Sequence, residues 1–325
     1  MKKALITGIA GQDGSYLAEL LLEKGYAVHG VVRDMSPSAL QRIERSRNRL
    51  SLHCGDIGDR IFVRKIVHDI LPDEVYHLAA IHEVPFSDDQ FQIVFTTNVH
   101  STYFLLSALY EYIPSARLFY ASSCSVFGAY RESPQNELTP FAPRSLYGVS
   151  KVTATHLVRA FREKFGFFGS VGILYNHESP RRDPFFITKK VTVGAARIKL
   201  GLETELVLGN LDAQRDWGFV GDFVRAMWLM LQHDKPDDYI IGTGETHSVR
   251  DLLTVAFGAL GLVWETYVRI DPALLRPADP IALVANPKKA RDVLGWKPTL
   301  SFQELITLMA QHDLEHLRGQ TQDLH

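Results

Sequence analysis

The chain has 325 residues, 46% of them hydrophobic and 22% charged, and a formal net charge of −2 at pH 7. This composition is that of a soluble globular protein, and the near-neutral charge favours neither a nucleic-acid nor a membrane partner. No apolar run is long enough for a transmembrane helix. The two cysteines, Cys54 and Cys124, fit neither a disulfide scaffold nor a zinc site, so we expect a cytoplasmic protein without a bound metal.

The first fifty residues predict a phosphate-binding turn between a strand and a helix. A buried strand over 4–6 leads into Thr7-Gly-Ile-Ala-Gly-Gln-Asp-Gly14, and an amphipathic helix follows over 15–24. The glycines permit a tight turn, close approach of the backbone to a pyrophosphate and close helix packing, while the helix N-terminus favours the anion. A second strand is expected over 27–32. We predict that a dinucleotide cofactor contacts Thr7, Gly8, Gly11, Gln12, Asp13 and Gly14.

The end of the second strand normally selects between NAD and NADP. An acid there hydrogen-bonds the ribose diol, whereas an arginine accommodates a 2′-phosphate. Arg33 favours NADP and Asp34 argues mildly against it, so we predict NADP, with NAD as the alternative. Asp56 follows another short strand, where its carboxylate either holds the adenine amino group or caps the helix that starts near Arg60.

The following units repeat the alternation of strand and helix. Strands are predicted over 74–80 and 116–122, and a helix from Asn98 to Tyr110 lies between them. This alternation predicts an α/β fold with a Rossmann-type, doubly wound parallel sheet, whose ligands lie beyond the carboxyl ends of the strands. Residues 79–83, 122–125 and Tyr147 should therefore surround one crevice.

The second half predicts a smaller C-terminal α/β lobe for the substrate. We expect helices over 189–200, 219–232, 248–261 and 286–295 and strands over 203–208 and 239–243. The last dozen residues should fray. The predicted domains are residues 1–175 for the cofactor, with returning segments near 210–245, and residues 176–325 mainly for the substrate.

Tyr147 and Lys151 are spaced to lie one turn apart on the same face of a helix. An ammonium group in that position lowers the pKa of the phenol, which makes Tyr147 usable as a base near neutral pH. An ordinary helix with a buried tyrosine and a lysine that reaches solvent would show the same spacing. The hydroxyl-rich stretch that ends the strand before them, Ser122 to Ser125, favours the catalytic interpretation.

Six stretches of the chain together resemble one family. They are Thr7-Gly-x-x-Gly-Gln-Asp-Gly-Ser-Tyr-Leu, Thr139-Pro-Phe-x-Pro-Arg-Ser, Tyr147-x-x-x-Lys151, Asn176-His-Glu-Ser-Pro-Arg-Arg182, Leu208-Gly-Asn-Leu-Asp-Ala-x-Arg-Asp-Trp-Gly218 and Arg276-Pro. They are similar to the bacterial GDP-mannose 4,6-dehydratases, which belong to the extended short-chain dehydrogenase/reductases. The resemblance runs from residue 2 to about residue 300.

The resemblance implies roles for individual residues. Tyr147 would take the proton of a sugar hydroxyl while its carbon loses hydride to the nicotinamide, Lys151 would lower the pKa of Tyr147, and Ser123 would hydrogen-bond the sugar oxygen. Further cofactor contacts are implied at Ile57, Leu78, Ala79, Ala80, Tyr147, Lys151, His177 and Arg182. Contacts to a GDP-sugar are implied at Ser123, Asn176, Thr188, Lys190, Leu208, Gly209, Asn210, Arg215, Arg276 and Asp279.

Two of these assignments carry additional implications. Arg215 either binds phosphate or forms a structural ion pair with Asp212 or Asp216. Arg181 and Arg182 would lie at a subunit contact close to the cofactor phosphate in a homodimer or homotetramer.

The chain departs from the family where a base is needed. The family has a glutamate that removes the sugar C5 proton, and this chain has Ser125 there, which is a far weaker base. After Leu78-Ala-Ala the family continues with a glutamine, a serine and an aromatic residue or histidine, whereas this chain continues with Ile81, His82 and Glu83. His82 or Glu83 is therefore a candidate relocated base.

Two more departures affect the shape of the pocket. Leu146 replaces a proline of the family and Asp183 replaces a glycine. We expect an enzyme that oxidises C4 of a GDP-hexose transiently with tightly bound NAD(P), acting as an epimerase. The alternative is a GDP-mannose 4,6-dehydratase with a relocated base. A 4-dehydrogenase, a 4-keto reductase and a non-catalytic cofactor sensor are further alternatives.

Overall fold

The computed structural model describes residues 1–82, 87–128, 132–274 and 282–322, and the side chains up to residue 319. Within these ranges, seven parallel strands form one sheet in the order β11-β6-β5-β4-β1-β2-β3. Their bounds are β1 Lys3–Thr7, β2 Ala27–Val32, β3 Ser51–Cys54, β4 Glu74–His77, β5 Arg117–Ser123, β6 Gly169–Leu174 and β11 Asp238–Ile241. The strand order reverses between β1 and β4, which creates a crevice at the carboxyl ends of the strands.

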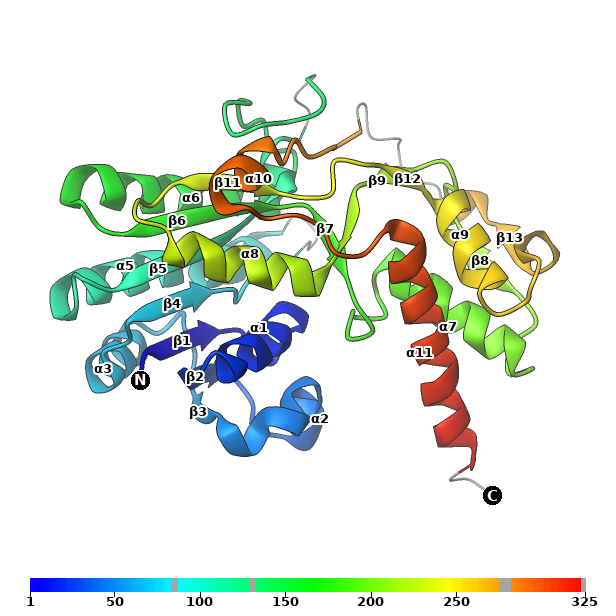
Figure 1. The fold of residues 1–325 in the computed structure, drawn as a ribbon, viewed down its shortest axis with the longest axis horizontal. Helices are drawn as coiled ribbons and strands as arrows, with labels where there is room; N and C mark the ends of the chain where they lie inside the picture. Colours follow the sequence, from blue (N-terminus) through cyan, green and yellow to red (C-terminus); the bar gives the residue numbers. More distant parts are fainter. Residues whose placement is uncertain (83–86, 129–131, 275–281, 323–325) are drawn as a thin grey trace.

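Helices cover both faces of the sheet (Figure 1). One face packs against α1 (Gln12–Glu23), α8 (Val220–Gln232) and α10 (Lys288–Leu294), with Leu17 and Met227 fully buried between the layers. The other face packs against α3 (Arg60–Ile70), α5 (Ser101–Tyr112) and α6 (Leu146–Phe165), with Leu105 and Val158 in the core. The predicted fold class, a Rossmann-type doubly wound α/β sheet, is confirmed.

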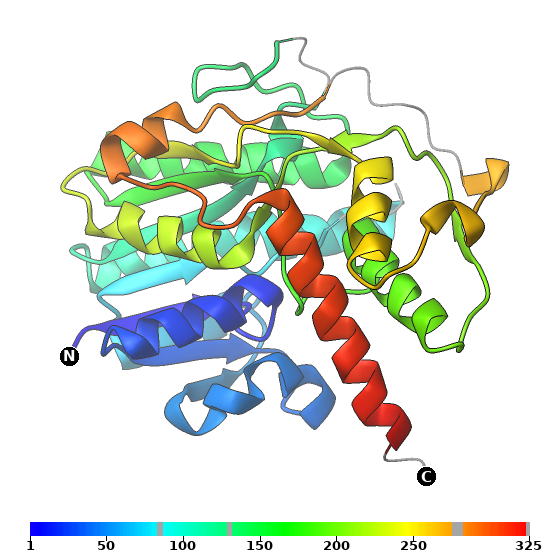
Figure 2. The same cartoon turned by 45° about the vertical axis from the view of Figure 1, so that its right-hand side comes forward.

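A second group of elements lies beside the sheet and has its own hydrophobic core. Its main members are α7 (Ile187–Lys199), α9 (Val249–Gly258), α11 (Phe302–Gln322), β8 (Leu206–Leu208) and β13 (Val268–Ile270). Figure 2 shows α11 running obliquely between this group and the part of the molecule that holds α1 and α2 (Pro37–Leu40). Between the two groups, β7 (Asn176–Glu178) pairs with β10 (Trp217–Phe219), and β9 (Gln214–Arg215) pairs with β12 (His247–Ser248).

Short helices complete the described chain. They are η1 (Gln41–Arg49), α4 (Asp88–Phe95), the π-helical turn η2 (Thr96–His100), η3 (Cys124–Val126), η4 (Trp264–Thr266) and η5 (Pro272–Leu274). None of the helices in the described ranges combines the length and apolar character needed to cross a membrane.

Several boundaries differ from the predictions for local physical reasons. The first helix begins at Gln12 rather than residue 15, because extended Gly11 is its N-cap and the Gly11 carbonyl already accepts from the Ser15 N–H. Asp59 rather than Asp56 caps α3, by accepting from the Ile61 N–H at 2.8 Å. Asn98 does not begin a helix, since it lies inside the π-helical turn between α4 and α5.

The expectation that the last dozen residues fray is wrong, because α11 continues to Gln322. Its start is held by Ser301, whose N–H donates to the Glu304 carboxylate and whose hydroxyl accepts from the Glu304 N–H. Farther along, Asp313 is buried between α11 and α7, where it pairs with Lys189 and accepts from the Thr192 hydroxyl at 2.6 Å. The length of α11 therefore depends on tertiary contacts that composition does not reveal.

This buried ion pair leads to a test of stability. We expect Asp313→Ala to lower the free energy of unfolding by about 3 kcal/mol, because it leaves the buried Lys189 ammonium without its counter-ion. Asp292→Ala is the matched control, since Asp292 pairs with Lys288 in solvent and its loss should cost less than about 1 kcal/mol. Chemical denaturation of both variants measures the difference, and equal losses would contradict a structural role for Asp313.

Candidate active site

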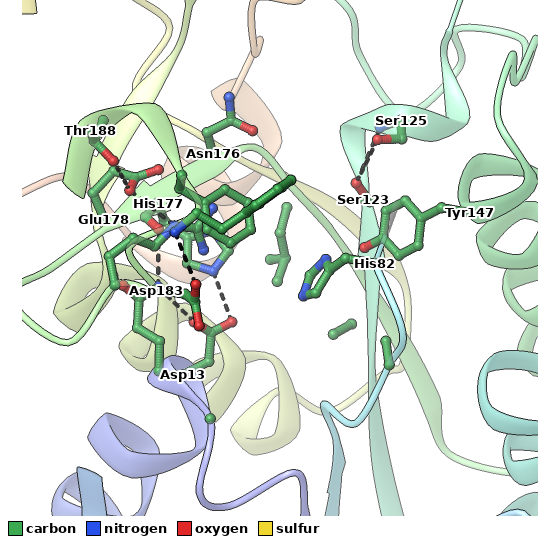
Figure 3. A pocket seen from close by; sticks show the side chains of 18 of the residues that line it. Asp13, His82, Ser123, Ser125, Tyr147, Asn176, His177, Glu178, Asp183 and Thr188 are labelled. Carbon is green, nitrogen blue, oxygen red and sulfur yellow. Dashed lines mark hydrogen bonds and ion pairs between the residues drawn. The ribbon is translucent and has the colours of Figure 1, made fainter. Parts of the chain in front are cut away.

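A cavity of about 1630 Å³ opens at the carboxyl ends of the central strands. One side is formed by the glycine-rich turn after β1, the end of β2 and residues of β5 and α6. The other side is formed by β7, the start of α7 and residues 208–215. Figure 3 shows His82, Ser123, Ser125 and Tyr147 across the cavity from Asn176, Glu178 and Thr188. The crevice predicted from the strand order therefore gathers residues that are far apart in the sequence.

The glycine-rich turn has no room for side chains. Gly8 adopts a φ of +74°, and a Cβ there would lie 2.9 Å from the backbone nitrogen of Ala79. A Cβ on Gly14 would lie 2.3 Å from the Gly8 carbonyl oxygen. No side chain caps the first turn of α1, and Gly11, Gln12 and Asp13 line the cavity there. A backbone cradle at an uncapped helix N-terminus fits the pyrophosphate of a dinucleotide.

Two predicted cofactor residues do not line this cavity. Thr7 is fully buried, and its hydroxyl lies 2.8 Å from His77 Nδ1 and accepts from the N–H groups of Leu78 and Ala79. It therefore holds the loop after β4 against β1. Asp56 accepts from the Gly58 N–H at 2.8 Å and is absent from the described lining. By contrast, Arg33, Ile57 and the Leu78–Ala80 segment line the cavity at its cofactor side.

Tyr147 and Lys151 lie together at the start of α6, where Ser145 caps the helix by accepting from the Gly148 N–H. The Lys151 ammonium donates to the Ala121 carbonyl at 2.7 Å and lies 5.6 Å from the centre of the Tyr147 ring. Both side chains are buried. Burial lowers the pKa of Lys151 to about 7, and burial raises the pKa of Tyr147 although a hydrogen bond with Ser123 opposes the rise. The expectation that Lys151 brings the Tyr147 pKa towards neutral is wrong for the protein alone, because desolvation of the buried phenol is the largest influence on its pKa.

Ser123 and Ser125 face Tyr147 from the end of β5 (Figure 3). The Ser123 hydroxyl donates to the Ser125 hydroxyl at 3.2 Å and accepts from the Ser125 N–H at 3.2 Å. This turn places both hydroxyls on the cavity wall. Ser125, at the position where the resemblance implies a glutamate, supplies no charge to the cavity.

His82 lies between two aromatic rings. Its ring centre is 5.4 Å from that of Tyr147 and 6.0 Å from that of Phe186, which meets it edge to face. Burial, together with the nearby Lys151 and Arg182 cations, lowers the pKa of His82 to about 4. Its ring is nevertheless exposed to the cavity, so solvent there screens part of this effect. His82 is a neutral imidazole at pH 7, while Glu83, the other predicted base, lies outside the described residues.

The wall opposite Tyr147 is built around two ion pairs. His177 Nε2 contacts the Asp13 carboxylate at 2.8 Å, and although burial opposes both shifts, the pairing lowers the pKa of Asp13 to about 2 and raises that of His177. The buried Glu178 accepts from the Thr188 hydroxyl at 2.5 Å and pairs with Arg182 at 3.0 Å. These contacts join the glycine-rich turn, β7 and α7 around the cavity.

The far end of the cavity holds the residues expected to bind the nucleotide. Those that line it are Asn176, Thr188, Lys190, Leu208, Gly209, Asn210 and Arg215. A Cβ on Gly209 would lie 2.3 Å from the Leu274 carbonyl oxygen, so this position requires glycine. Asp212, one of the two ion-pair partners expected for Arg215, pairs with Arg250 at 2.9 Å. Arg276 and Asp279 lie outside the described residues.

Comparison with known proteins identifies the family. The GDP-mannose 4,6 dehydratase family model matches residues 5–309. The chain is 47% identical to GDP-mannose 4,6 dehydratase 2 of Arabidopsis thaliana, over 97% of this chain and 87% of the plant protein. It is 41% identical to GDP-mannose 4,6-dehydratase of Sinorhizobium fredii, over 99% of both chains. The chain belongs to the GDP-mannose 4,6-dehydratase family.

The solved structures place this family member in a wider group. UDP-glucose 4-epimerase of Thermotoga maritima superposes with a TM-score of 0.85 at 25% identity, over 97% of this chain and 99% of that one. Membership of the GDP-mannose 4,6-dehydratase family confirms the predicted resemblance and the prediction of an NAD(P)-dependent sugar-nucleotide enzyme. The comparisons do not support an epimerase as the main prediction, since the relatives at high identity are dehydratases.

Sequence reasoning missed three residues of this family member's cavity. Glu178 lies inside a quoted family block but was given no role, although a carboxylate flanked by buried positions is a signal of ion pairing. Phe186 contacts His82 and stacks on the Arg182 guanidinium at 3.5 Å, and Arg42 reaches the cavity from η1. Neither had a signal in the spacing of the sequence.

A buried polar layer supports the loop that carries His82. His77, fully buried, contacts Thr7 and lies 3.1 Å from the Thr102 hydroxyl and 3.2 Å from that of Ser101. Burial lowers the pKa of His77 to about 3, and the Lys151 cation adds to this effect. The folded protein therefore keeps His77 neutral at pH values where the unfolded chain protonates it.

His77 should make stability depend on pH. Its pKa is about 3 in the folded protein and ~6.5 when unfolded, so the unfolded chain binds more protons between these values and stability falls as pH drops through that window. From pH 7 to pH 5 this effect amounts to about 2 kcal/mol. We expect His77→Gln to remove that share of the pH dependence, measured by urea denaturation at both pH values. His68→Gln, at an exposed histidine, is the control. If the free energy of unfolding of His77→Gln depends on pH as strongly as that of the unchanged protein, His77 is not the source of this pH dependence.

Proposed function

We propose that this protein is a GDP-hexose 4,6-dehydratase acting on GDP-mannose or a close relative, with His82 as the base at C5. The observation that carries the proposal is the placement of a neutral imidazole against the Tyr147 ring in the cavity. The activity named for the relatives of highest identity supports the same reaction. The proposal keeps the family chemistry and changes the group that performs one step.

The cavity fits a nicotinamide dinucleotide. The cradle around Gly8 and Gly14 would hold its pyrophosphate, Arg33 and Ile57 line the adenosine end, and Tyr147 and Lys151 line the nicotinamide end. When bound, NADP would supply a hydride acceptor for C4 and a donor for C6, together with a positive charge beside Tyr147. Such a charge favours the phenolate, which offsets the burial that raises the pKa of Tyr147.

Tyr147 would take the proton of the C4 hydroxyl, and Ser123 would donate a hydrogen bond to the same sugar oxygen. The hydrogen bond that links Ser123 to Tyr147 places both groups where one oxygen reaches them. Lys151 has its ammonium fixed on the Ala121 carbonyl, beneath the Tyr147 ring, where it stabilises negative charge on the phenol oxygen. The product is a 4-keto sugar with an acidified C5 proton.

The described carboxylates of the cavity are poor candidates for the base that takes this proton. Asp13 pairs with His177, Glu178 with Arg182, Asp183 with Arg42 and Asp212 with Arg250, while Asp34 accepts from the backbone and hydroxyl of Ser36. Breaking the largely buried Asp13–His177 or Glu178–Arg182 pair would leave a buried partner unsatisfied. Ser125 is too weakly acidic and too weakly basic to replace a carboxylate.

His82 has the basicity that the step needs. Burial and nearby cations lower its pKa, so the imidazole is unprotonated at pH 7 and can accept a proton. In the proposed step His82 takes the C5 proton, the C5–C6 double bond forms, and the imidazolium returns a proton to the departing C6 hydroxyl as water. His82 would then take up a proton from solvent and return it to C5, and the bound cofactor would supply the hydride at C6, which gives the 4-keto-6-deoxy sugar.

The nucleotide would occupy the opposite end of the cavity. Asn210, Arg215 and Lys190 line it and offer an amide and two cations to the GDP portion. Arg276 and Asp279, outside the described residues, are proposed as further contacts to phosphate and guanine. We also propose that the protein acts as a homodimer or homotetramer, which sedimentation would measure.

One observation favours a second candidate, a C4 epimerase. Ser125 removes the family's carboxylate, and without any base at C5 a 4-keto intermediate can only be reduced again, on either face. Among the solved structures, a UDP-glucose 4-epimerase at 25% identity shares the fold. This candidate predicts a product of unchanged mass with C4 inverted.

The test is to incubate the protein with GDP-mannose and NADP in heavy water and to follow the sugar by NMR and mass spectrometry. We expect a 4-keto-6-deoxy product that carries deuterium at C5. His82→Asn should lower its rate by roughly 10²–10⁴, because a positioned base is lost, while reduced cofactor still forms when the sugar binds. Ser125→Ala should change the rate by less than about tenfold.

Two outcomes would overturn the assignment. If His82→Asn dehydrates the sugar at the full rate and Glu83→Gln does not dehydrate it, the base is Glu83 rather than His82. An inverted C4 without deuterium or loss of water would establish the epimerase. His100→Asn, at an exposed histidine of the η2 turn, is the control for general effects of histidine replacement.

A further inference from the structure

One side chain ties the loop before α7 to the cofactor side of the cavity. Arg42, on η1, donates from Nε to the Arg181 carbonyl at 2.9 Å, and its terminal nitrogen lies 3.6 Å from the Asp183 carboxylate. Arg42 and Asp183 both line the cavity. The contacts join residues 139 and 141 positions apart in the sequence.

Residues 181–183 form a strap, anchored at a second point by α1. The Arg181 guanidinium donates to the Ser15 hydroxyl at 3.0 Å and to the Glu19 carboxylate at 2.7 Å, and it lies over the Tyr16 ring. Asp183 also accepts from the Phe185 N–H at 3.0 Å, which fixes its carboxylate near Arg42. The strap therefore holds a carboxylate at the cofactor side of the cavity.

The same region holds Arg33 and Asp34, from which the sequence predicts the choice between NADP and NAD. Arg33 follows the last residue of β2 directly and lines the cavity. Arg42, nine residues later in the sequence, also lines the cavity. The Asp34 carboxylate accepts from the Ser36 N–H and hydroxyl at 2.8 and 2.6 Å, at the N-terminus of α2. The Asp34 carboxylate is thus held by Ser36, and Asp183 is the described carboxylate that contacts Arg42.

We propose that Asp183 is a specificity-determining residue that weakens binding of a ribose 2′-phosphate by competing with it for Arg42. The inference rests on the proposed function only in requiring that a nicotinamide dinucleotide occupies this cavity. A 2′-phosphate that reaches Arg42 must displace the Asp183 carboxylate or accept it as a neighbouring negative charge. NAD lacks the 2′-phosphate, so it neither displaces the Asp183 carboxylate nor is repelled by it. Asp183 therefore reduces the difference in affinity by which Arg33 and Arg42 favour NADP over NAD.

The test measures binding of NADP and NAD to the whole protein by titration calorimetry, without sugar. Asp183→Asn should tighten NADP roughly fivefold and change NAD less than about twofold, the size expected for one partly screened carboxylate near a phosphate. Arg42→Gln should weaken NADP roughly tenfold. In the double variant most of the Asp183→Asn effect should disappear, because Asp183 acts through Arg42.

Glu44→Gln is the matched control. Glu44 is on η1, the helix that carries Arg42, and it pairs with Arg47 at 3.6 Å. This pair is about as exposed to solvent as the pair of Arg42 and Asp183, but Glu44 does not line the cavity. Its replacement should therefore change the affinity for neither NADP nor NAD. Equal shifts for NADP and NAD in Asp183→Asn, or an undiminished effect in the Arg42→Gln background, would overturn the inference. Failure to bind either dinucleotide would instead contradict the proposed function, so the two failures are distinguishable.

Discussion

The close approach of β1 and β4 at their carboxyl ends is the constraint on which the cavity depends. Gly8 lies so near the Ala79 backbone that no side chain fits, and the buried Thr7 hydroxyl contacts His77 and both N–H groups that follow β4. This contact fixes the pyrophosphate cradle and the start of the loop that carries His82 relative to each other. A substitution at Gly8 would therefore disturb the cofactor and the base together.

Burial acts in opposite ways on the two groups that would handle protons. It raises the pKa of Tyr147, which makes this phenol a poor base without a cation beside it, and it lowers the pKa of His82, which keeps that imidazole neutral. The same cavity therefore requires a charged cofactor for one proton transfer and needs none for the other. In the proposed reaction the C4 step comes first, because the 4-keto group is what acidifies the C5 proton.

Most local elements and several groups of residues that line the crevice could be predicted, since they follow from patterns within short windows. The glycines at 8, 11 and 14 and the spacing of Tyr147 and Lys151 are such patterns. The pKa of Tyr147 could not be predicted, because helix spacing indicates which side chains are neighbours but not how much water surrounds them. The contact between Arg42 and Asp183 and the packing of Asp313 against α7 join residues more than a hundred positions apart, and a single sequence holds no signal for them.

A serine rather than a carboxylate at position 125 is consistent with the other charges in the cavity. Besides burial, the influence on the pKa of Lys151 comes from Asp13, whose own charge is already balanced by His177. A carboxylate at position 125 would add a negative charge near Lys151 and Tyr147, which would raise the pKa of both. Its absence lets burial hold the Lys151 pKa near 7, and it also removes the anion that would favour protonation of His82. A neutral imidazole at His82 and a neutral hydroxyl at Ser125 therefore belong to one electrostatic arrangement, which is consistent with the proposed role of His82 as the base.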